Sequence, residues 1–149
     1  MLITKKYNFM STRAQIRFAT REDGVSFSEH PEKIHAQFYC HSDGYPEGLG
    51  LNIAMSILKN DKISNWEIEH VQDLHTDLEY VYYIWSDYDK STWISIFHMI
   101  PAYCETCGQD VPFESKDKCI FVGTPEKLIT KYGSQLEDSY YKLNTNNDG

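Results

Sequence analysis

The fold is decided by the stretch Tyr39-Cys40-His41-Ser42-Asp43-Gly44-Tyr45-Pro46-Glu47-Gly48-Leu49-Gly50, which joins a predicted strand to a predicted helix. This stretch holds three of the eight glycines of the chain. Asp43-Gly44 predicts a turn with Gly44 at positive φ, because glycine tolerates that region and aspartate bonds its own backbone. Gly48 and Gly50 are expected to leave backbone N–H groups open near the helix start, where an anion could bind.

Predicted strands precede this stretch, and a predicted helix follows it. Residues 14–19 and 34–40 alternate apolar and polar side chains, which is the period of a β-strand. Residues 25–27 are expected to form a short partner strand between them. From Glu47 to about Lys59 the apolar residues recur at helical spacing, so we expect an amphipathic helix there.

The clearest hairpin lies further along the chain. Leu78–Trp85 and Thr92–Ile100 consist almost entirely of β-branched and aromatic residues, and a polar segment separates them. Apolar residues on both faces predict central strands that are covered on two sides. The segment from Trp66 to His75, just before the hairpin, fits either a short strand or irregular structure.

The C-terminal third predicts an irregular segment from Pro101, a short strand over 119–122 and a second helix. Thr124 suits the N-cap of that helix, Pro125 its first turn and Gly133 its end. The order of elements predicts an α+β fold, with an antiparallel sheet, two main helices packed on one side and a Cys-containing loop segment. We expect an N-terminal extension over 1–9, one domain over 10–134 and a polar tail over 135–149.

Composition limits the classes of function. The chain has 149 residues, 41% of them hydrophobic and 14% aromatic, which suits a folded domain with a real core. Its net charge of −8 argues against direct nucleic-acid binding, because phosphates are repelled. No apolar run reaches the ~18 residues of a membrane helix, and the first ten residues lack a signal-peptide core. We therefore expect a cytoplasmic protein.

The segment Cys104-Glu105-Thr106-Cys107-Gly108 is the best chemical signal. A C-x-x-C pair followed by glycine turns two thiolates toward one point, as a structural zinc ion requires. Cys119 is the expected third ligand. The expected fourth ligand is His98, and the other candidates for that position are Cys40 and His41. Reduced thiols without metal are the alternative reading.

His41 and Asp43 stand two residues apart in the loop, as an acid–base pair could. They would serve a small metal-dependent hydrolase, but no sequence motif of nucleophilic or phosphate chemistry accompanies them. Alternatively, Asp43 shapes the turn and His41 is an exposed polar residue.

A recognition surface is the second reading of the loop. The hairpin is rich in tyrosine and tryptophan, whose rings anchor partners when half exposed, although they more often fill a core. The predicted ligand- or partner-binding residues come from the loop and the hairpin: His41, Asp43, Gly44, Tyr45, Gly48, Gly50, Tyr82 and Trp85.

Two pieces of the sequence carry a family resemblance. Met10-Ser11-Thr12-Arg13-Ala14 followed by a strand, and the His-x-Asp-Gly-Tyr-Pro-x-Gly-x-Gly loop at His41–Gly50, resemble a group of small phage and prophage proteins of unsettled function. The resemblance covers about the first third of the chain, together with the tyrosine-rich strand. It implies a viral accessory protein in the cytoplasm of a bacterial host, and it supplies no catalytic residues.

Together these observations favour a non-enzymatic binder of the anti-defence type. It would inhibit a host protein by covering a basic surface, or hold a small nucleotide-like ligand in the loop. The alternatives are the metal-dependent hydrolase and a zinc-stabilised module of a larger viral assembly. A homo-oligomer is left open.

Overall fold

The computed structural model describes residues 12–21, 30–31, 33–63, 65–75, 77–87, 89–104 and 109–133, with backbone alone for 100–104 and 109–116. These residues form a mixed six-stranded sheet of order β3-β2-β1-β4-β5-β6 and helices on one of its faces. The predicted α+β class is thereby confirmed. In chain order the elements are β1 (Arg13–Thr20), β2 (Lys33–Cys40), the π-helical turn η1 (Pro46–Gly50), α2 (Leu51–Lys59), β3 (Trp66–Glu69), β4 (Leu78–Ser86), β5 (Thr92–Cys104), β6 (Gln109–Gly123) and α3 (Pro125–Tyr132).

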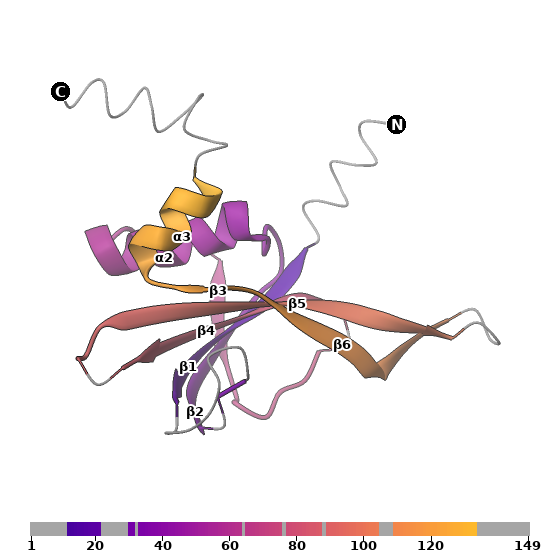
Figure 1. Ribbon diagram of the computed structural model, residues 1–149. Helices are drawn as coiled ribbons and strands as arrows, with labels where there is room; N and C mark the ends of the chain where they lie inside the picture. The colour runs from indigo at the N-terminus through magenta and orange to yellow at the C-terminus, as the bar shows by residue number, and fades with distance from the viewer. Residues whose placement is uncertain are drawn as a thin grey trace.

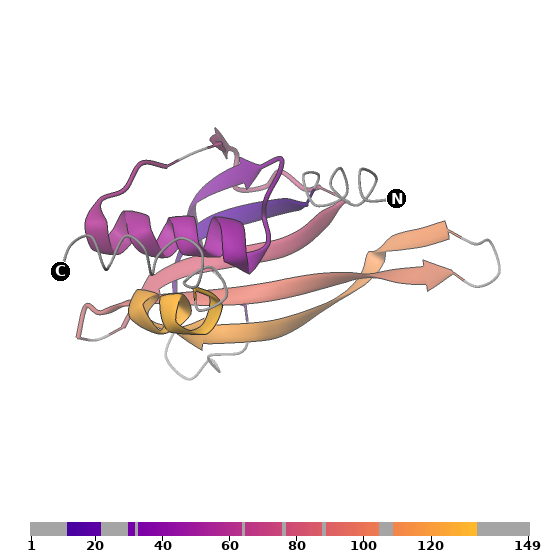
Figure 2. The same cartoon turned by 90° about the horizontal axis from the view of Figure 1, so that it is seen from above.

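Both helices pack on the same face of the sheet, as Figures 1 and 2 show. The core between the layers is built from the apolar stripe of each helix and from alternate strand residues. Its largest fully buried members are Ile16, Ile53, Tyr82, Ile94, Ile96 and Leu128. Because these residues hold the start of α2 against β1 and β4, the loop that precedes α2 is fixed as well.

The sequence signals at the helix ends act as expected. Thr124 caps α3 through its Oγ1, which accepts a hydrogen bond of 3.3 Å from the backbone N–H of Lys127. The N–H of Gly133 closes the helix by donating to the carbonyl of Ile129 at 2.7 Å. At the end of α2, Asn60 adopts a left-handed conformation with φ of 57°. That conformation reverses the chain and lets it return toward β3.

The prediction of an antiparallel sheet is wrong at one pairing. β1 and β4 run parallel, with Ile16 opposite Tyr82. The strands of a parallel pair need a crossover, and here the chain between them contains β2, α2 and β3. The last leg of this crossover, from β3 to β4, passes on the side of the sheet opposite the helices (Figure 1).

The Cys-containing loop segment is not confirmed. The backbone of β5 continues to Cys104 and that of β6 starts at Gln109, so much of the predicted irregular segment is a two-stranded ribbon. Figure 2 shows this ribbon extending beyond the other strands. Pro101 suggested a break because it cannot donate a ladder hydrogen bond, but the pairing register shifts between Ile100 and Ala102, at Pro101 itself.

Of the remaining predicted elements, some are confirmed and the others lie outside the described residues. The predicted hairpin is β4–β5, the ambiguous segment contains β3, and the strand at 119–122 is the end of β6. The predicted strand at 25–27, the extension over 1–9 and the tail over 135–149 lie outside the described residues.

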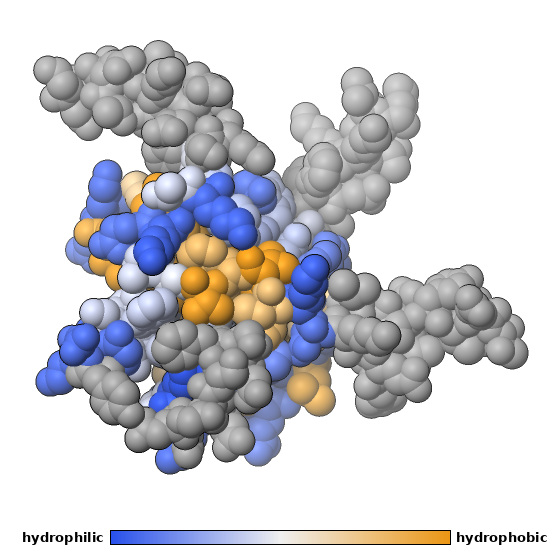
Figure 3. Space-filling view, viewed as in Figure 1, coloured by the Kyte–Doolittle hydropathy of each residue, from blue (hydrophilic) through white to orange (hydrophobic). Residues whose placement is uncertain are grey.

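The face opposite the helices is called here the helix-free face. It carries a second apolar cluster whose buried members are Ala19, Val81, Tyr83, Trp85 and Phe97. Residues 81–85 of β4 are therefore buried on both faces, as predicted for a central strand. Cys119 and Val122 of β6 are half-buried against this cluster, whereas Ile120 and Phe121 pack on the helix side. Figure 3 shows an apolar area on the side of the molecule where β6 lies.

Candidate functional site

The loop before α2 is held down by the buried side chain of Tyr82. The Tyr82 hydroxyl donates a 2.7 Å hydrogen bond to the carbonyl of Gly44, and the N–H of Gly44 donates to the carbonyl of Thr12 at 3.0 Å. The positive φ of the turn belongs to Asp43, at 58°, so the prediction that placed it at Gly44 is wrong. Glycine is needed at 44 for a different reason: the backbone there lies directly against β1.

The predicted anion site at the loop amides is not formed by Gly48. Its N–H donates to the carbonyl of Tyr45 at 2.9 Å, and the next N–H, of Leu49, donates to the carbonyl of Asp43 at 3.0 Å. Gly50 already has helical φ and ψ and is buried against Tyr82. These hydrogen bonds make the loop rigid and consume the donors that an anion would use.

His41 and Asp43 are both exposed, but each has a different partner. His41 Nε2 lies 3.1 Å from the carboxylate of Glu67, whereas the Tyr45 hydroxyl lies 3.4 Å from the carboxylate of Asp43. The geometry of an acid–base pair is therefore not formed between His41 and Asp43. Asp43 also lines a shallow hollow of about 190 Å³ together with Cys40, Ser42, Gly48, Leu49, Asn52 and Asn65.

The two hairpin residues predicted to contact a partner lie in the interior. The side chain of Tyr82 is 0% exposed and that of Trp85 is 3% exposed. Trp85 donates from Nε1 to the hydroxyl of Ser95 at 2.9 Å and stacks on Trp93. Burial raises the pKa of Tyr82 well above its ordinary value. Both residues fix the shape of the sheet and do not meet solvent.

Tyrosines and glutamates line a larger hollow beside the loop. This acidic hollow has a volume of about 450 Å³ and is lined by Thr12, Tyr45, Glu47, Glu79 and Tyr80. Its two halves come from the loop and from the start of β4, which the bond between Tyr82 and Gly44 holds together. Burial first, and then the charge of Glu47, raise the pKa of the nearby Tyr132 to about 12. Glu47 therefore projects negative charge over a cluster of phenols.

The predicted zinc ligands are separated as far as the structure describes them. His98 stacks on Tyr80, a residue of the helix-side core, whereas Cys119 belongs to the cluster on the helix-free face. The side chain of Cys104 and all of Cys107 lie outside the described residues. Within the described part of the chain, no three His, Cys, Asp or Glu side chains are grouped closely enough to hold a metal ion. Zinc binding by Cys104 and Cys107 stays a prediction.

Sequence reasoning missed a polar cluster on the helix-free face. Gln15 and Gln37 are fully buried, and each donates from Nε2 to the carboxylate of Glu69, at 2.8 and 2.7 Å. The same amides reach the carbonyls of His70 and Asp73 in the crossing from β3 to β4. A backbone that crosses a sheet face has polar groups to satisfy, and these glutamines satisfy them.

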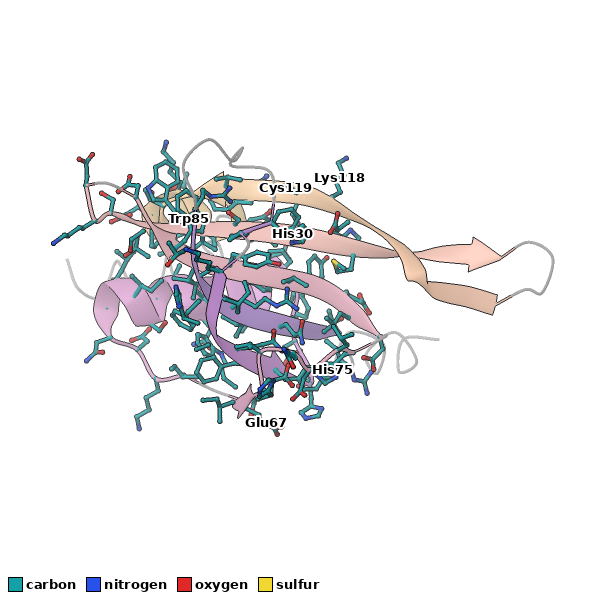
Figure 4. The ribbon with its side chains drawn as sticks, turned by 90° about the horizontal axis from the view of Figure 1, so that it is seen from below. His30, Glu67, His75, Trp85, Lys118 and Cys119 are labelled. Carbon is teal, nitrogen blue, oxygen red and sulfur yellow. The ribbon has the colours of Figure 1, made fainter. Side chains whose placement is uncertain are left out.

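Arg17 extends this cluster toward β5 and β6. Its guanidinium donates to the side-chain oxygens of Gln37 and Gln15 and, at 2.9 Å, to the hydroxyl of Tyr83. His30 contacts the same hydroxyl and the carboxylate of Asp117, and its ring stacks on Phe97. A continuous series of hydrogen bonds thus joins β3 to β6 across the sheet. Figure 4 shows His75 and His30 at its opposite sides.

Glu69 gives the cluster an acid-sensitive member. Burial raises the pKa of Glu69, but hydrogen bonds from His75, Gln15 and Gln37 outweigh it and hold the pKa below the ordinary value. A carboxyl group whose pKa is lower in the folded chain than in the unfolded chain stabilises the fold at pH values above its unfolded pKa. This stabilisation is lost as the pH falls through the pKa of the folded chain.

We expect Glu69→Gln to be less stable than the parent at neutral pH, with a difference that shrinks as the pH falls below the ordinary range of a carboxyl group. Urea unfolding over this fall in pH measures it. Asp89→Asn, which removes an exposed charge from the turn between β4 and β5, controls for net charge. A difference that stayed constant with pH would show that the Glu69 carboxylate is not stabilised in the folded chain.

Among the helices that the structure describes, none has the length and apolar composition needed to span a membrane. Comparison of the chain with models of protein families, with curated proteins and with solved structures gives no match.

Proposed function

We propose that this chain is a phage-type accessory protein that inhibits a host protein by binding a basic surface of it, without catalysing a reaction. The acidic hollow is the observation that carries this proposal. Two phenol rings and two carboxylates line it, from Tyr45, Tyr80, Glu47 and Glu79. An ammonium or guanidinium group is attracted both by ring faces and by carboxylates, so a lysine or arginine side chain of the partner is the occupant.

The hollow is preorganised for such a contact. The Tyr45 ring is tethered by its hydroxyl to Asp43, and the loop beneath it is fixed by hydrogen bonds to β1 and to Tyr82. A rigid site loses little conformational freedom on binding, so more of the contact energy appears as affinity. The net charge of −8 adds long-range attraction toward a basic partner.

Charge also favours one of the two ligand classes that the sequence left open. A nucleotide-like ligand carries phosphates, and the carboxylates of Glu47, Glu79 and Asp43 stand at the two hollows beside the loop. Phosphate would be repelled there, since the amides of Gly44, Gly48 and Leu49, which could have offset this charge, are bonded internally. The hydrolase alternative lacks a supporting contact, because His41 and Asp43 have separate partners. A basic protein surface is the ligand that fits.

The test is capture of the partner from phage-infected bacteria, measured for matched charge variants. We expect Glu47→Gln/Glu79→Gln to reduce capture about tenfold, because both carboxylates face the bound cation. Asp61→Asn/Glu126→Gln removes the same charge at exposed positions away from the hollow and is expected to capture as the parent does. Equal losses for the two double variants, or no loss for the first, would contradict the proposal.

The resemblance to phage proteins supports action in the cytoplasm of a bacterial host. Cysteines stay reduced in that compartment, so Cys104 and Cys107 would be free to bind zinc. Such a metal would be structural and would not enter the contact made at the acidic hollow.

A further inference from the structure

A third hollow opens at the end of the sheet remote from the acidic hollow. Its volume is about 550 Å³, and it lies where the C-terminal part of α2 meets the ends of β1 and β4. The apolar part of its wall comes from Phe18, Ile57 and Ile84. Ile57 is 37% exposed, so an apolar side chain stands open to solvent at this hollow. An apolar recess with a few polar groups is the usual form of a small-ligand site.

A β-bulge directs one polar group to this hollow. In the pairing of β1 with β2, Phe18 faces Ala36 and the next residue, Ala19, faces Ile34, which leaves His35 as the extra residue. Bulges of this kind re-aim the extra side chain. Here His35 is exposed, lines the hollow and is hydrogen-bonded through Nε2 to the hydroxyl of Thr20.

Among the residues that the structure describes, the polar groups at the opening of this hollow favour an anion. Lys33 is paired with Thr20 across the two strands, which places this lysine beside the opening of the hollow. The carboxylate of Asp87 is turned away to Trp93 Nε1 and to the backbone N–H of Ser91, at 2.8 and 3.0 Å. Hydroxyl and imidazole groups at the opening, with Lys33 beside them, suit a carboxylate head group.

We propose that this hollow binds a small carboxylic acid with an apolar tail. The tail packs against Phe18, Ile57 and Ile84, and the carboxylate accepts hydrogen bonds at His35 and Thr20. This site is separate from the acidic hollow and does not depend on the function proposed for it.

Three probes of equal tail length test the proposal: octanoate, octanol and octylamine. Each is titrated into the full-length labelled chain and followed by amide NMR. We expect octanoate to bind about tenfold more tightly than octanol, because its charged carboxylate makes stronger hydrogen bonds than a hydroxyl group does. We expect octylamine to bind more weakly than either. Absence of binding by all three, or octylamine binding as tightly as octanoate, would overturn the proposal.

Two substitutions separate the tail from the head group. Ile57→Glu places a carboxylate at the apolar wall and is expected to weaken octanoate binding at least about tenfold. Ile63→Glu, at a position that is 54% exposed and outside the hollow, is the control and is expected to leave binding unchanged. His35→Ala is expected to reduce octanoate binding to the level of octanol and to leave octanol unaffected. Equal effects of the Ile57 and Ile63 variants on octanoate binding, or loss of octanol binding in His35→Ala, would also overturn the proposal. The amide spectrum of each variant without ligand verifies that it is folded.

Discussion

Replacing Gly44 with alanine is expected to lower the free energy of unfolding by about 3 kcal/mol. A Cβ built at Gly44 lies 2.8 Å from the Cβ of Ala14 and 3.1 Å from the carbonyl oxygen of Thr12. Ala14 lies in β1 and Thr12 immediately precedes that strand, and both residues are buried, so neither can yield at small cost. Moving the loop instead would lengthen the hydrogen bond from Tyr82 to the Gly44 carbonyl.

Gly50 provides the matched control within the same loop. It has helical φ and ψ of −56° and −46°, and a Cβ there would meet its nearest neighbour, a ring carbon of Tyr82, at 3.5 Å. Gly50→Ala is therefore expected to be neutral or to stabilise by up to about 1 kcal/mol. Thermal unfolding separates the two variants, with the Gly44 variant melting roughly 6–12 °C lower than the parent. Similar melting temperatures for both would show that the backbone at Gly44 is not pressed against β1.

Features that depend on neighbours in the chain could be predicted from the sequence. Runs of aromatic and β-branched residues indicate the two strands of the β4–β5 hairpin. Thr124, Pro125 and Gly133 indicate where α3 begins and ends, because each of these signals acts within a few residues. The stripe of α2 predicts the buried side chains of its first half, Leu51, Ile53 and Ala54, whereas Ile57 and Leu58 of the same stripe are exposed. Local chemistry is sufficient for these elements.

The parallel pairing of β1 with β4 could not be predicted in this way. It depends on where a crossover of many residues passes, and no residue of β1 encodes that path. The burial of Gln15 and Gln37 could not be predicted for the same reason. Polar residues at alternate positions of a strand suggest a face that is open to solvent, and the sequence does not show that the β3–β4 connection covers this face. In the structure Arg17 and Gln37, both polar, stand opposite each other in the β1–β2 register, which the sequence does not specify.

The candidate site was predicted in part. The loop was correctly singled out as an organised turn, but its glycines and Tyr82 serve packing, whereas Tyr45 and Asp43 reach the surface. Glu47, Glu79 and Tyr80 complete the acidic hollow, and no spacing rule joins the loop to the start of β4. The acidic hollow can be recognised only in the structure, where the parallel pairing of β4 with β1 brings the start of β4 next to the loop.

The glutamines of the helix-free face carry the second large expected effect. Gln37→Met is expected to lower the free energy of unfolding by about 3–4 kcal/mol, more than a surface substitution, because several buried groups lose their partner together. The Gln37 amide oxygen accepts from Arg17 Nε at 2.8 Å, and its nitrogen donates to Glu69 and to the carbonyls of His70 and Asp73. Methionine fills the same volume but offers neither donor nor acceptor.

Gln72→Met makes the same chemical change at an exposed position of the β3–β4 connection, and it is expected to alter stability by less than about 0.5 kcal/mol. Urea unfolding compares the two variants, and hydrogen exchange of the amides over 70–75 reports whether the connection is released from the sheet. Combining Gln37→Met with Glu69→Gln is expected to cost less than the sum of the single effects, because Glu69 already lacks its charge when Gln37 is removed. Strict additivity, or equal effects at positions 37 and 72, would mean that the connection is held to the sheet by something other than these side-chain hydrogen bonds.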